Sequence, residues 1–370
     1  MTETEAFLVL NAAISSGNIP LEKIVEIFGS VSDFVAAASK GLKNHPCPQM
    51  ASLAEKVCKF PTEAFLKKEQ GLIKKKDVSI VTYYDPNYPQ ILKQNRNAPV
   101  VLYVKGRKDR LNQLSIAIVG SRRASIYGLL MAEKFAEGLA GYGITIVSGM
   151  ARGIDSAAHR GCLRGGGTTI AVLGSGLANI YPPENKNLMQ KIIQEGIVIS
   201  EFSMETPPLS YNFPRRNRIV SGLSCGVIVV EASQRSGALI TSHFALEQGK
   251  EVFAVPGNID HPNTKGVHAL IKQGAKLVCC LEDILEEIAP EIIFRDNQEK
   301  NKPESRDILK NEKFTEKEEE IYRLINKKPI YVDELVNQCH YTLSDLSGTL
   351  LKLQLKSCIL QLPGNYFVRA

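Results

Sequence analysis

Several features that would place a protein in a special class are missing from this sequence of 370 residues. It has no run of about 18 apolar residues, so we expect no membrane-spanning helix and no membrane partner. The first residues, MTETEAFLVLNAAISSGN, lack the basic and apolar regions of an export signal. No internal repeat of solenoid period is visible. These absences predict a cytoplasmic protein.

The eight cysteines form no CxxC pair and no cysteine–histidine spacing typical of a zinc site. Free cysteines behave as small apolar side chains and are commonly buried. We therefore predict buried free thiols, no metal site and no cofactor.

The composition is that of an ordinary globular protein, with 44% hydrophobic and 23% charged residues. This excludes a wholly disordered chain, a collagen and a coiled-coil array. The length predicts two or three domains. The net charge is +6, and most of the basic excess lies between residues 76 and 290.

Hydrophobic patterning divides the chain into four segments. Residues 1–75 alternate apolar helical stretches with short breaks and predict a small helical domain, similar to SAM or helix-hairpin-helix domains. Residues 76–290 form the main domain, which opens with two strands flanking a Pro- and Tyr-rich turn. Residues 291–314 are polar and charged, as in a linker. Residues 315–370 read as three helices and a hairpin, which predicts a winged helix.

Short, fully apolar runs in the main domain alternate with amphipathic segments. The expected strands are 115–120, 144–149, 169–174, 197–202, 227–232, 251–257 and 276–281. Continuous apolar strands separated by helices indicate a parallel sheet covered on both faces. We therefore predict an α/β, doubly wound, Rossmann-like domain.

Ligands of such sheets bind beyond the carboxyl ends of the strands, where helix N-termini converge. No GxGxxG loop follows the first strand, and arginines occupy the turns instead. Guanidinium groups bind phosphate through planar, charge-assisted hydrogen bonds. Several such positions along one edge suit a polyphosphate chain and favour nucleic acid. The candidates are Gly120, Ser121, Arg122, Arg123, Arg152, Phe213, Arg215, Arg216, Asn217, Arg218, Ser236 and Gly237.

Phe213 stands beside three of these arginines. Grooves for single strands combine cations with rings on which bases stack, and NFPRRNR has that composition. The alternative is that Phe213 belongs to the core and the arginines form a solvated helix face. The position of the arginines at the ligand-binding edge favours the groove.

Candidate catalytic groups are weaker, and we expect no catalytic residue. Asp155 and His159 are four residues apart and could form an acid–base pair, but an aspartate at a helix start more often serves as a cap. Glu231 and Glu247 could pair as carboxylates, although a strand-end glutamate near arginines is more often their counter-ion. Ser236 opens a helix and has no histidine at a spacing that would activate it.

Six motifs in this order resemble the DprA/Smf family of DNA-processing proteins. They are GSRRAS, SGMARGIDSAAH, TIAVLGSGLANIYPPEN, SEFSMETPPLSYNFPRRNRIVSGLS, VVEASQRSGALITSHFALEQGKEVFAVPGN and GVHALIKQGAKLV. The resemblance is dense over residues 115–281, and the flanking segments agree with the family's layout.

The resemblance implies a non-enzymatic homodimer that binds single-stranded DNA and loads RecA onto it during natural transformation. It implies that Ser121 and Arg122 contact phosphate and that Phe213 lines the groove together with Arg215, Arg216 and Arg218. The family's SGxLIT helix start falls on residues 236–241. A dimer-forming surface near the domain's end would include His268, Ile271 and Leu277; for Ile271 and Leu277 the alternative is a place in the core.

Some residues depart from the family pattern, and other functions stay open. Glu205 adds a negative charge beside the expected groove, and the predicted recognition helix of the winged helix offers only Lys352 and Lys356 as cations. Because groove reading depends on a basic footprint, that domain is expected to contact proteins or to regulate. The alternatives are a nucleotide enzyme on a phosphoribohydrolase-like Rossmann variant and, third, a winged-helix transcription factor.

Overall fold

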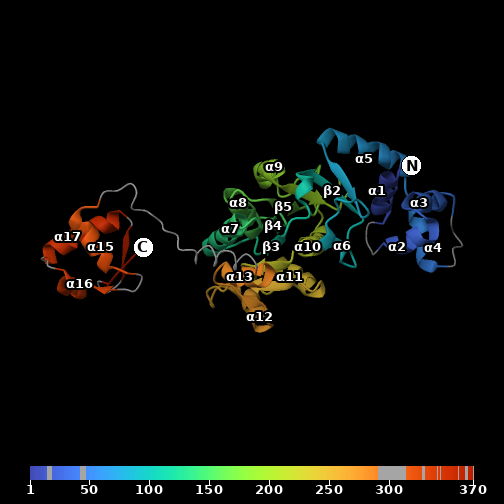
Figure 1. The fold of residues 1–370 in the computed structure, drawn as a ribbon. Helices are drawn as coiled ribbons and strands as arrows, with labels where there is room; N and C mark the ends of the chain where they lie inside the picture. The colour runs from blue at the N-terminus through green and yellow to red at the C-terminus, as the bar shows by residue number, and fades with distance from the viewer. Residues whose placement is uncertain are drawn as a thin grey trace. The chain divides into compact units, whose positions relative to one another are not determined.

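The computed structural model describes residues 1–14, 19–41, 47–290, 314–326, 330–339, 341, 343–356, 358–362 and 366–369. They fall into two compact units, one within Met1–Asp296 and one within Asn297–Ala370 (Figure 1). The predicted linker lies, except for residue 314, outside the described residues. No helix in the described ranges has both the length and the apolarity to cross a membrane.

A nine-stranded sheet forms the centre of the first unit, in the order β1-β2-β6-β5-β4-β3-β7-β8-β9. Strands β3 to β9 are parallel to one another, whereas β2 is antiparallel to both β1 and β6. The strands are β1 Ser79–Thr82, β2 Val101–Gly106, β3 Ser115–Val119, β4 Thr145–Ser148, β5 Thr169–Val172, β6 Ile197–Ser200, β7 Gly226–Val229, β8 Glu251–Ala254 and β9 Lys276–Leu277.

All seven predicted parallel strands are confirmed, as is the strand pair at the start of the main domain. The parallel strands are shorter at their carboxyl ends than predicted, because the residues there leave the sheet and form turns. The doubly wound Rossmann-like fold is therefore correct.

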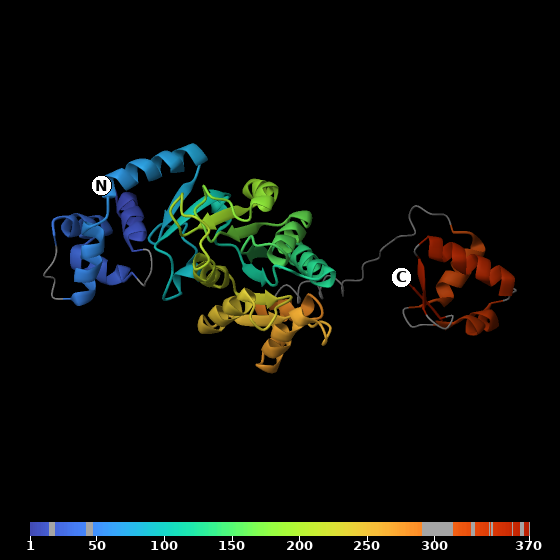
Figure 2. The same ribbon diagram turned by 180° about the vertical axis from the view of Figure 1, so that it is seen from behind.

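Helices cover both faces of this sheet. They are α6 Gln90–Lys93, α7 Ile126–Gly141, α8 Ile154–Arg164, α9 Lys186–Glu195, α10 Asn212–Gly222, α11 Gly237–Glu247, α12 Lys265–Lys272 and α13 Glu282–Ile288, with the 3₁₀ turns η1 Lys108–Arg110, η2 Pro183–Asn185 and η3 Pro262–Thr264. Side chains of β3 alternate between the faces: Ile116 and Ile118 pack with α7 and α8, and Ala117 and Val119 pack with α10 and α11. Figures 1 and 2 show α8 and α11 on opposite sides of the strands.

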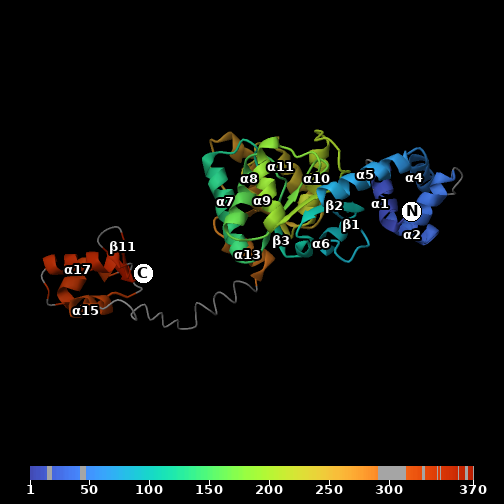
Figure 3. The same cartoon turned by 90° about the horizontal axis from the view of Figure 1, so that it is seen from above.

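The N-terminal helices lie beside the β1–β2 end of the sheet (Figure 3). They are α1 Glu3–Ala13, α2 Leu21–Phe28, α3 Val31–Ser39, α4 Pro48–Cys58 and α5 Thr62–Lys76. Phe7 of α1 and Phe34 of α3 share one apolar core with Tyr103 of β2 and Val198 of β6. Apolar burial of this kind is the main stabilising term in folding, so the helical segment is bound to the sheet.

The second unit has the winged-helix arrangement expected for the end of the chain. Its elements are α15 Glu316–Leu324, β10 Ile330–Tyr331, α16 Val332–Gln338, α17 Leu343–Leu355, β11 Ile359–Leu362 and β12 Tyr366–Arg369. The strands form a sheet in the order β10-β12-β11. Lys356, one of the two cations expected on the recognition helix, forms an ion pair of 3.1 Å with Glu318 of α15.

No disulfide links the eight cysteines, all of which lie in the described ranges, but the predicted burial is correct only for Cys162, Cys339 and Cys358, and Cys47 and Cys225 are half-buried. Cys58, Cys279 and Cys280 are exposed, because the first ends a surface helix and the other two follow the edge strand β9. Cys162 lies on the buried face of α8, and burial raises its pKa to about 12.

Candidate nucleic-acid interface

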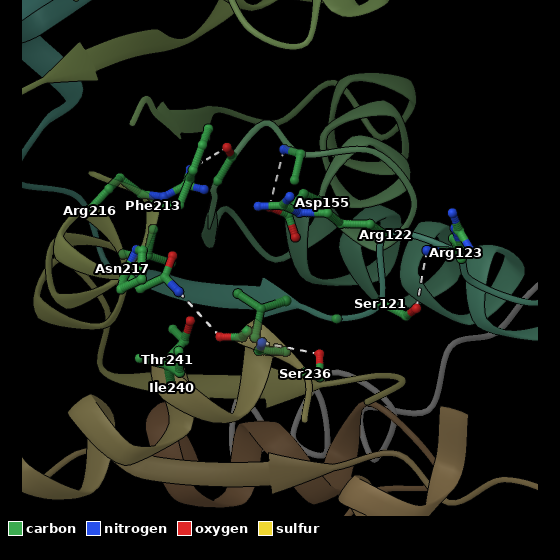
Figure 4. Close-up of a pocket in the computed structure, with 18 of the residues that line it drawn as sticks. Ser121, Arg122, Arg123, Asp155, Phe213, Arg216, Asn217, Ser236, Ile240 and Thr241 are labelled. Carbon is green, nitrogen blue, oxygen red and sulfur yellow. Dashed lines mark hydrogen bonds between the residues drawn. The ribbon is translucent and has the colours of Figure 1, made fainter. Parts of the chain in front are cut away.

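A pocket of about 720 Å³ opens at the carboxyl ends of the central strands (Figure 4). The order of the strands switches there: β4, β5 and β6 follow one another on one side of β3, and β7, β8 and β9 follow one another on its other side. Such a switch point is where open α/β sheets bind ligands, because the loops on its two sides diverge. The turn after β3, the start of α10 and the start of α11 line the pocket.

The turn after β3 is held from below by two neighbouring loops. Ser121 donates its amide to the Glu231 carbonyl at 2.7 Å, and its own carbonyl accepts the Ile154 amide at 3.2 Å. Gly153 has a φ of +72°, and a Cβ there would lie 2.2 Å from the Ser121 carbonyl oxygen. Only glycine meets both requirements, so this turn has a fixed backbone path.

Glu231 anchors the start of α7 and is not the counter-ion of the arginines. Its carboxylate accepts the Ser125 amide at 2.9 Å and also binds the Ser125 hydroxyl, which caps α7. The side chain is buried at 1% exposure. Glu247 lies near the end of α11 and pairs with His243 at 3.2 Å, so the two glutamates do not form a carboxylate pair.

Arg122 and Arg123 are the exposed cations of the pocket. Among the described residues, no carboxylate lies within ion-pair distance of either side chain. The Arg122 guanidinium lies 5.1 Å from the centre of the half-buried Phe213 ring, which in turn packs 5.5 Å from Tyr181. Gly174 is required beneath this ring, since a Cβ there would approach it to 2.8 Å. Cation and ring thus stand side by side at the pocket wall.

Arg216 lies deeper, at 3% exposure, beneath the pocket. Its guanidinium donates to the carbonyls of Gly149 and Val172, at the ends of β4 and β5. Burial lowers the pKa of Arg216 to about 10, an effect that the negative charge of Asp155 opposes. Arg216 therefore stays positive at neutral pH. Its hydrogen bonds link the ends of β4 and β5, and its side chain also lines the pocket.

Asp155 and His159 do not form an acid–base pair. The Asp155 carboxylate accepts the Ala151 amide at 3.2 Å and faces Arg216, and burial raises its pKa. His159 is fully buried, and its Nδ1 lies 2.7 Å from the Thr169 hydroxyl. Because that hydroxyl already donates to the Ile146 carbonyl, it accepts from His159, and burial lowers the histidine pKa to about 3. His159 is thus a neutral core residue.

Besides Phe213 and Arg216, the α10–α11 side of the pocket contains three further predicted residues. Ser236 caps α11 by accepting the Ala238 amide at 3.2 Å, and Asn217 donates to the Gly237 carbonyl at 3.2 Å. Figure 4 shows Asn217 and Thr241 across the pocket from Arg122. The pocket therefore brings together Gly120, Ser121, Arg122, Arg123, Phe213, Arg216, Asn217, Ser236 and Gly237.

Three predicted arginines lie outside this pocket. Arg152 lines a smaller adjoining pocket next to Phe213 and forms an ion pair with Glu184. Arg215 stands over the Phe202 ring at 5.3 Å, on the other side of α10. Arg218 pairs with the buried Glu201, so its charge is used within the fold. Helical spacing places Arg215, Arg216 and Arg218 on different faces of α10.

Asn263, which also lines the pocket, was missed by the sequence reasoning. Its side-chain amide donates to the Arg123 carbonyl at 2.7 Å and so holds the arginine turn. It follows β8, whose carboxyl end lies at the same sheet edge. The polar residues after that strand were the signal that could have identified it.

Glu205 and the expected dimer residues lie elsewhere. The negative charge of Glu205 is matched by an ion pair with Lys68 of α5. His268 contacts the Gly257 carbonyl at 3.2 Å, Ile271 packs partly into the core beneath α12, and Leu277 is 45% exposed on the edge strand β9. A surface made by these three residues stays a prediction.

Fold and pocket together define a class: a Rossmann-like α/β protein whose switch-point site is lined by arginine and phenylalanine in place of a glycine-rich dinucleotide loop. Comparison with known proteins gives the family. Residues 79–289 match the model of the DNA recombination-mediator protein A family, and residues 302–365 match that of the DprA winged helix domain. The chain belongs to the DNA recombination-mediator protein A family.

Similar proteins extend over most of the chain. Protein Smf of Escherichia coli is 41% identical over 283 residues, covering 75% of this chain and 74% of that protein. DNA processing protein DprA of Streptococcus pneumoniae is 47% identical over 203 residues, covering 55% and 72%. The X-ray structure of the S. pneumoniae protein covers 78% of this chain and 98% of its own, with a TM-score of 0.67 at 38% identity.

Another solved structure is that of DNA processing protein A from Helicobacter pylori, which was determined to explain its single-stranded DNA binding mode. It covers 58% of this chain and 96% of its own, with a TM-score of 0.53 at 29% identity.

Proposed function

We propose that this protein binds single-stranded DNA across the arginine pocket, protects it and loads RecA onto it in natural transformation and recombination. It acts as a cytoplasmic homodimer and performs no covalent chemistry. Ser121 and Arg122 contact phosphate, and Phe213 offers its ring to a base. Arg123, Arg216 and the helix start at Ser236 complete the pocket's contacts.

The observation that carries this proposal is the pair formed by Arg122 and Phe213. The guanidinium is exposed, pairs with no described carboxylate and lies 5.1 Å from the ring centre. A strand presents a phosphate and a base at each nucleotide, and a cation beside a ring matches that repeat. An acid–base enzyme would instead need a titratable side chain free to exchange protons. Asp155 lines the pocket but is buried, accepts the Ala151 amide and faces Arg216, and His159 is held neutral in the core.

The similar proteins support the same conclusion. The H. pylori protein binds single-stranded DNA according to its structural description, and relatives are named DNA processing proteins. RecA loading and the homodimer follow from the family resemblance of the sequence. The exposed Leu277 and the short edge strand β9 support a self-complementary surface at that end of the sheet.

The test is a fluorescence titration of a labelled dT oligomer with the full chain at several salt concentrations. Affinity should fall with salt, with a log–log slope of about 0.7 for each phosphate neutralised. Arg122→Ala should weaken binding and reduce the slope. Lys108→Ala is the matched control, because Lys108 is exposed at the opposite sheet edge, after the antiparallel strand β2.

Competition separates a strand binder from a nucleotide enzyme. Excess dTMP and duplex of equal length should displace little of the oligomer. Displacement by dTMP, or an affinity and slope unchanged by Arg122→Ala, would overturn the proposed pocket.

RecA loading and dimer formation need their own measurements. Leu277→Arg places a charge on the proposed self-complementary surface and should convert dimers to monomers in sedimentation equilibrium. The wild-type protein should shorten the lag of RecA assembly on single strands, and Arg122→Ala should not. An unchanged lag with the wild-type protein would contradict loading.

A further inference from the structure

A second group of rings and cations follows β1, on the side of the sheet where the strands carry their carboxyl ends and the arginine pocket opens. Because β1 and β6 are both antiparallel to β2, the carboxyl end of β1 points the same way as those of β3 to β8. The residues that follow β1 are Tyr83 and Tyr84. They therefore lie on the pocket's side of the sheet, at its far end.

Lys93 of α6 stands over both tyrosine rings, with its Nζ 4.7 Å from the centre of Tyr83 and 5.5 Å from that of Tyr84. Tyr84 is 45% exposed. A separate pocket of about 530 Å³ opens here, and its charged lining residues are Lys23, Lys93, Arg96 and a single carboxylate, Glu22. The excess of positive charge beside an exposed ring suits a phosphate chain with bases.

A third group lies between these two pockets, after β6. Arg215 stands 5.3 Å from the centre of the Phe202 ring, and the 61% exposed Tyr211 lines the same hollow. Residues 202–211 lead from the end of β6 into α10, whose start lines the arginine pocket. The three cation–ring pairs thus lie beyond the carboxyl ends of β1, β6 and β3, on the same side of the sheet.

We propose that the bound single strand continues beyond the arginine pocket, over Arg215 and Tyr211, to the Lys93–tyrosine cluster formed by Tyr83, Tyr84 and Lys93. This inference rests on the proposed function and adds a second contact region to it. The occupant is the same DNA strand, recognised by stacking on Tyr84 and by phosphate contact with Lys93.

The sheet gives the length of strand required. Five inter-strand steps separate β1 from β3, which amounts to about 24 Å at ~4.8 Å each. A strand stacked as in B-DNA advances ~3.4 Å for each nucleotide, so about seven nucleotides cross the interval. A dT oligomer of about five nucleotides can fill the arginine pocket alone, whereas one of about fifteen reaches the cluster.

The test measures affinity for both oligomers with the full-length protein. Lys93→Met removes the charge and keeps an unbranched stem over the rings, and Tyr84→Ala removes an exposed ring. Each should weaken binding of the long oligomer about fivefold or more and leave the short one unchanged. Lys108→Met is the control at the opposite edge, and circular dichroism checks that each variant folds.

The outcomes separate the two proposals. If both variants bind the long oligomer as Lys108→Met does, while Arg122→Ala weakens it, the strand ends at the arginine pocket and the extension is wrong. If Lys93→Met weakens both oligomers equally, the cluster acts through the fold and the extension is also wrong. If Arg122→Ala changes neither oligomer, the proposed function itself fails.

Discussion

Replacing Arg216 by methionine should cost more stability than any other single change in the pocket. The guanidinium is 3% exposed and donates to the carbonyls of Gly149 and Val172 while facing the buried Asp155. The methionine leaves two buried carbonyls without this donor, which costs about 1–3 kcal/mol for each. That is a large part of the ~5–15 kcal/mol that stabilises a typical domain. The methionine also removes a positive charge that lowers the pKa of Asp155, although no ion pair joins the two side chains.

The loss should depend on pH through Asp155. Burial raises the pKa of this carboxyl above its ordinary 3.8, and Arg216 opposes the rise; without Arg216 the pKa rises further. An acid whose pKa is raised in the folded state loses stability as pH increases from its unfolded to its folded pKa. The variant's deficit against the wild type should therefore be largest near neutral pH and shrink on acidification toward pH 4.

Urea unfolding followed by circular dichroism measures this deficit at several pH values. Arg216→Met combined with Asp155→Asn should recover part of the stability, because the uncompensated charge is then gone. Arg122→Ala is the comparison, since an exposed arginine should change stability by less than about 0.5 kcal/mol. A deficit that stays constant with pH and is not reduced by Asp155→Asn would refute the argument from the Asp155 charge.

The remaining predictions concern two buried polar groups, Glu69 and His159, and the turn after β3. The Met204 amide is buried and donates to the Glu69 carboxylate at 2.8 Å, so Glu69→Leu leaves it without its acceptor. We expect the free energy of unfolding to fall by about 1–3 kcal/mol and hydrogen exchange at Met204 to become faster. Glu69→Gln should stay near the wild type because it keeps an oxygen. Burial lowers the pKa of His159 from 6.5 to about 3, so stability should fall as pH drops below 6.5, by about 2 kcal/mol at pH 5. His159→Leu should remove this part of the pH dependence of thermal unfolding. An unaltered pH dependence in the variant would contradict this prediction. Gly153→Ala places a Cβ 2.2 Å from the Ser121 carbonyl oxygen at a φ of +72°. We expect the free energy of unfolding to fall by about 2 kcal/mol or more and oligomer binding to weaken. A melting temperature equal to that of the wild type would show that the turn relaxes freely.

Sequence reasoning located the pocket because its signal is local. Apolar runs identify buried parallel strands, and parallel strands bring their carboxyl ends to one edge. Nine of the twelve predicted interface residues therefore line one pocket. The turn residues Ser121 and Arg122 could be placed from their position after the first strand alone.

The direction of each arginine depended on the tertiary structure. Arg215, Arg216 and Arg218 are close in sequence, but a helix turns each to a different environment: one over Phe202, one beneath the pocket and one onto Glu201. Which face of α10 meets the sheet is set by packing against β5 and α11, and spacing alone does not reveal it.

What the sequence by itself determined is the order of the elements, the class of the fold and the end of the strands at which the candidate site lies, because periodicity and strand–helix alternation are properties of adjacent residues. The tertiary structure decided which charges face the pocket and which are paired inside the fold. It also showed that Tyr84 and Lys93 share an edge with Arg122, since that depends on β2 running antiparallel between β1 and β6. Charge availability and strand direction are settled by contacts between distant residues, which only the folded chain brings together.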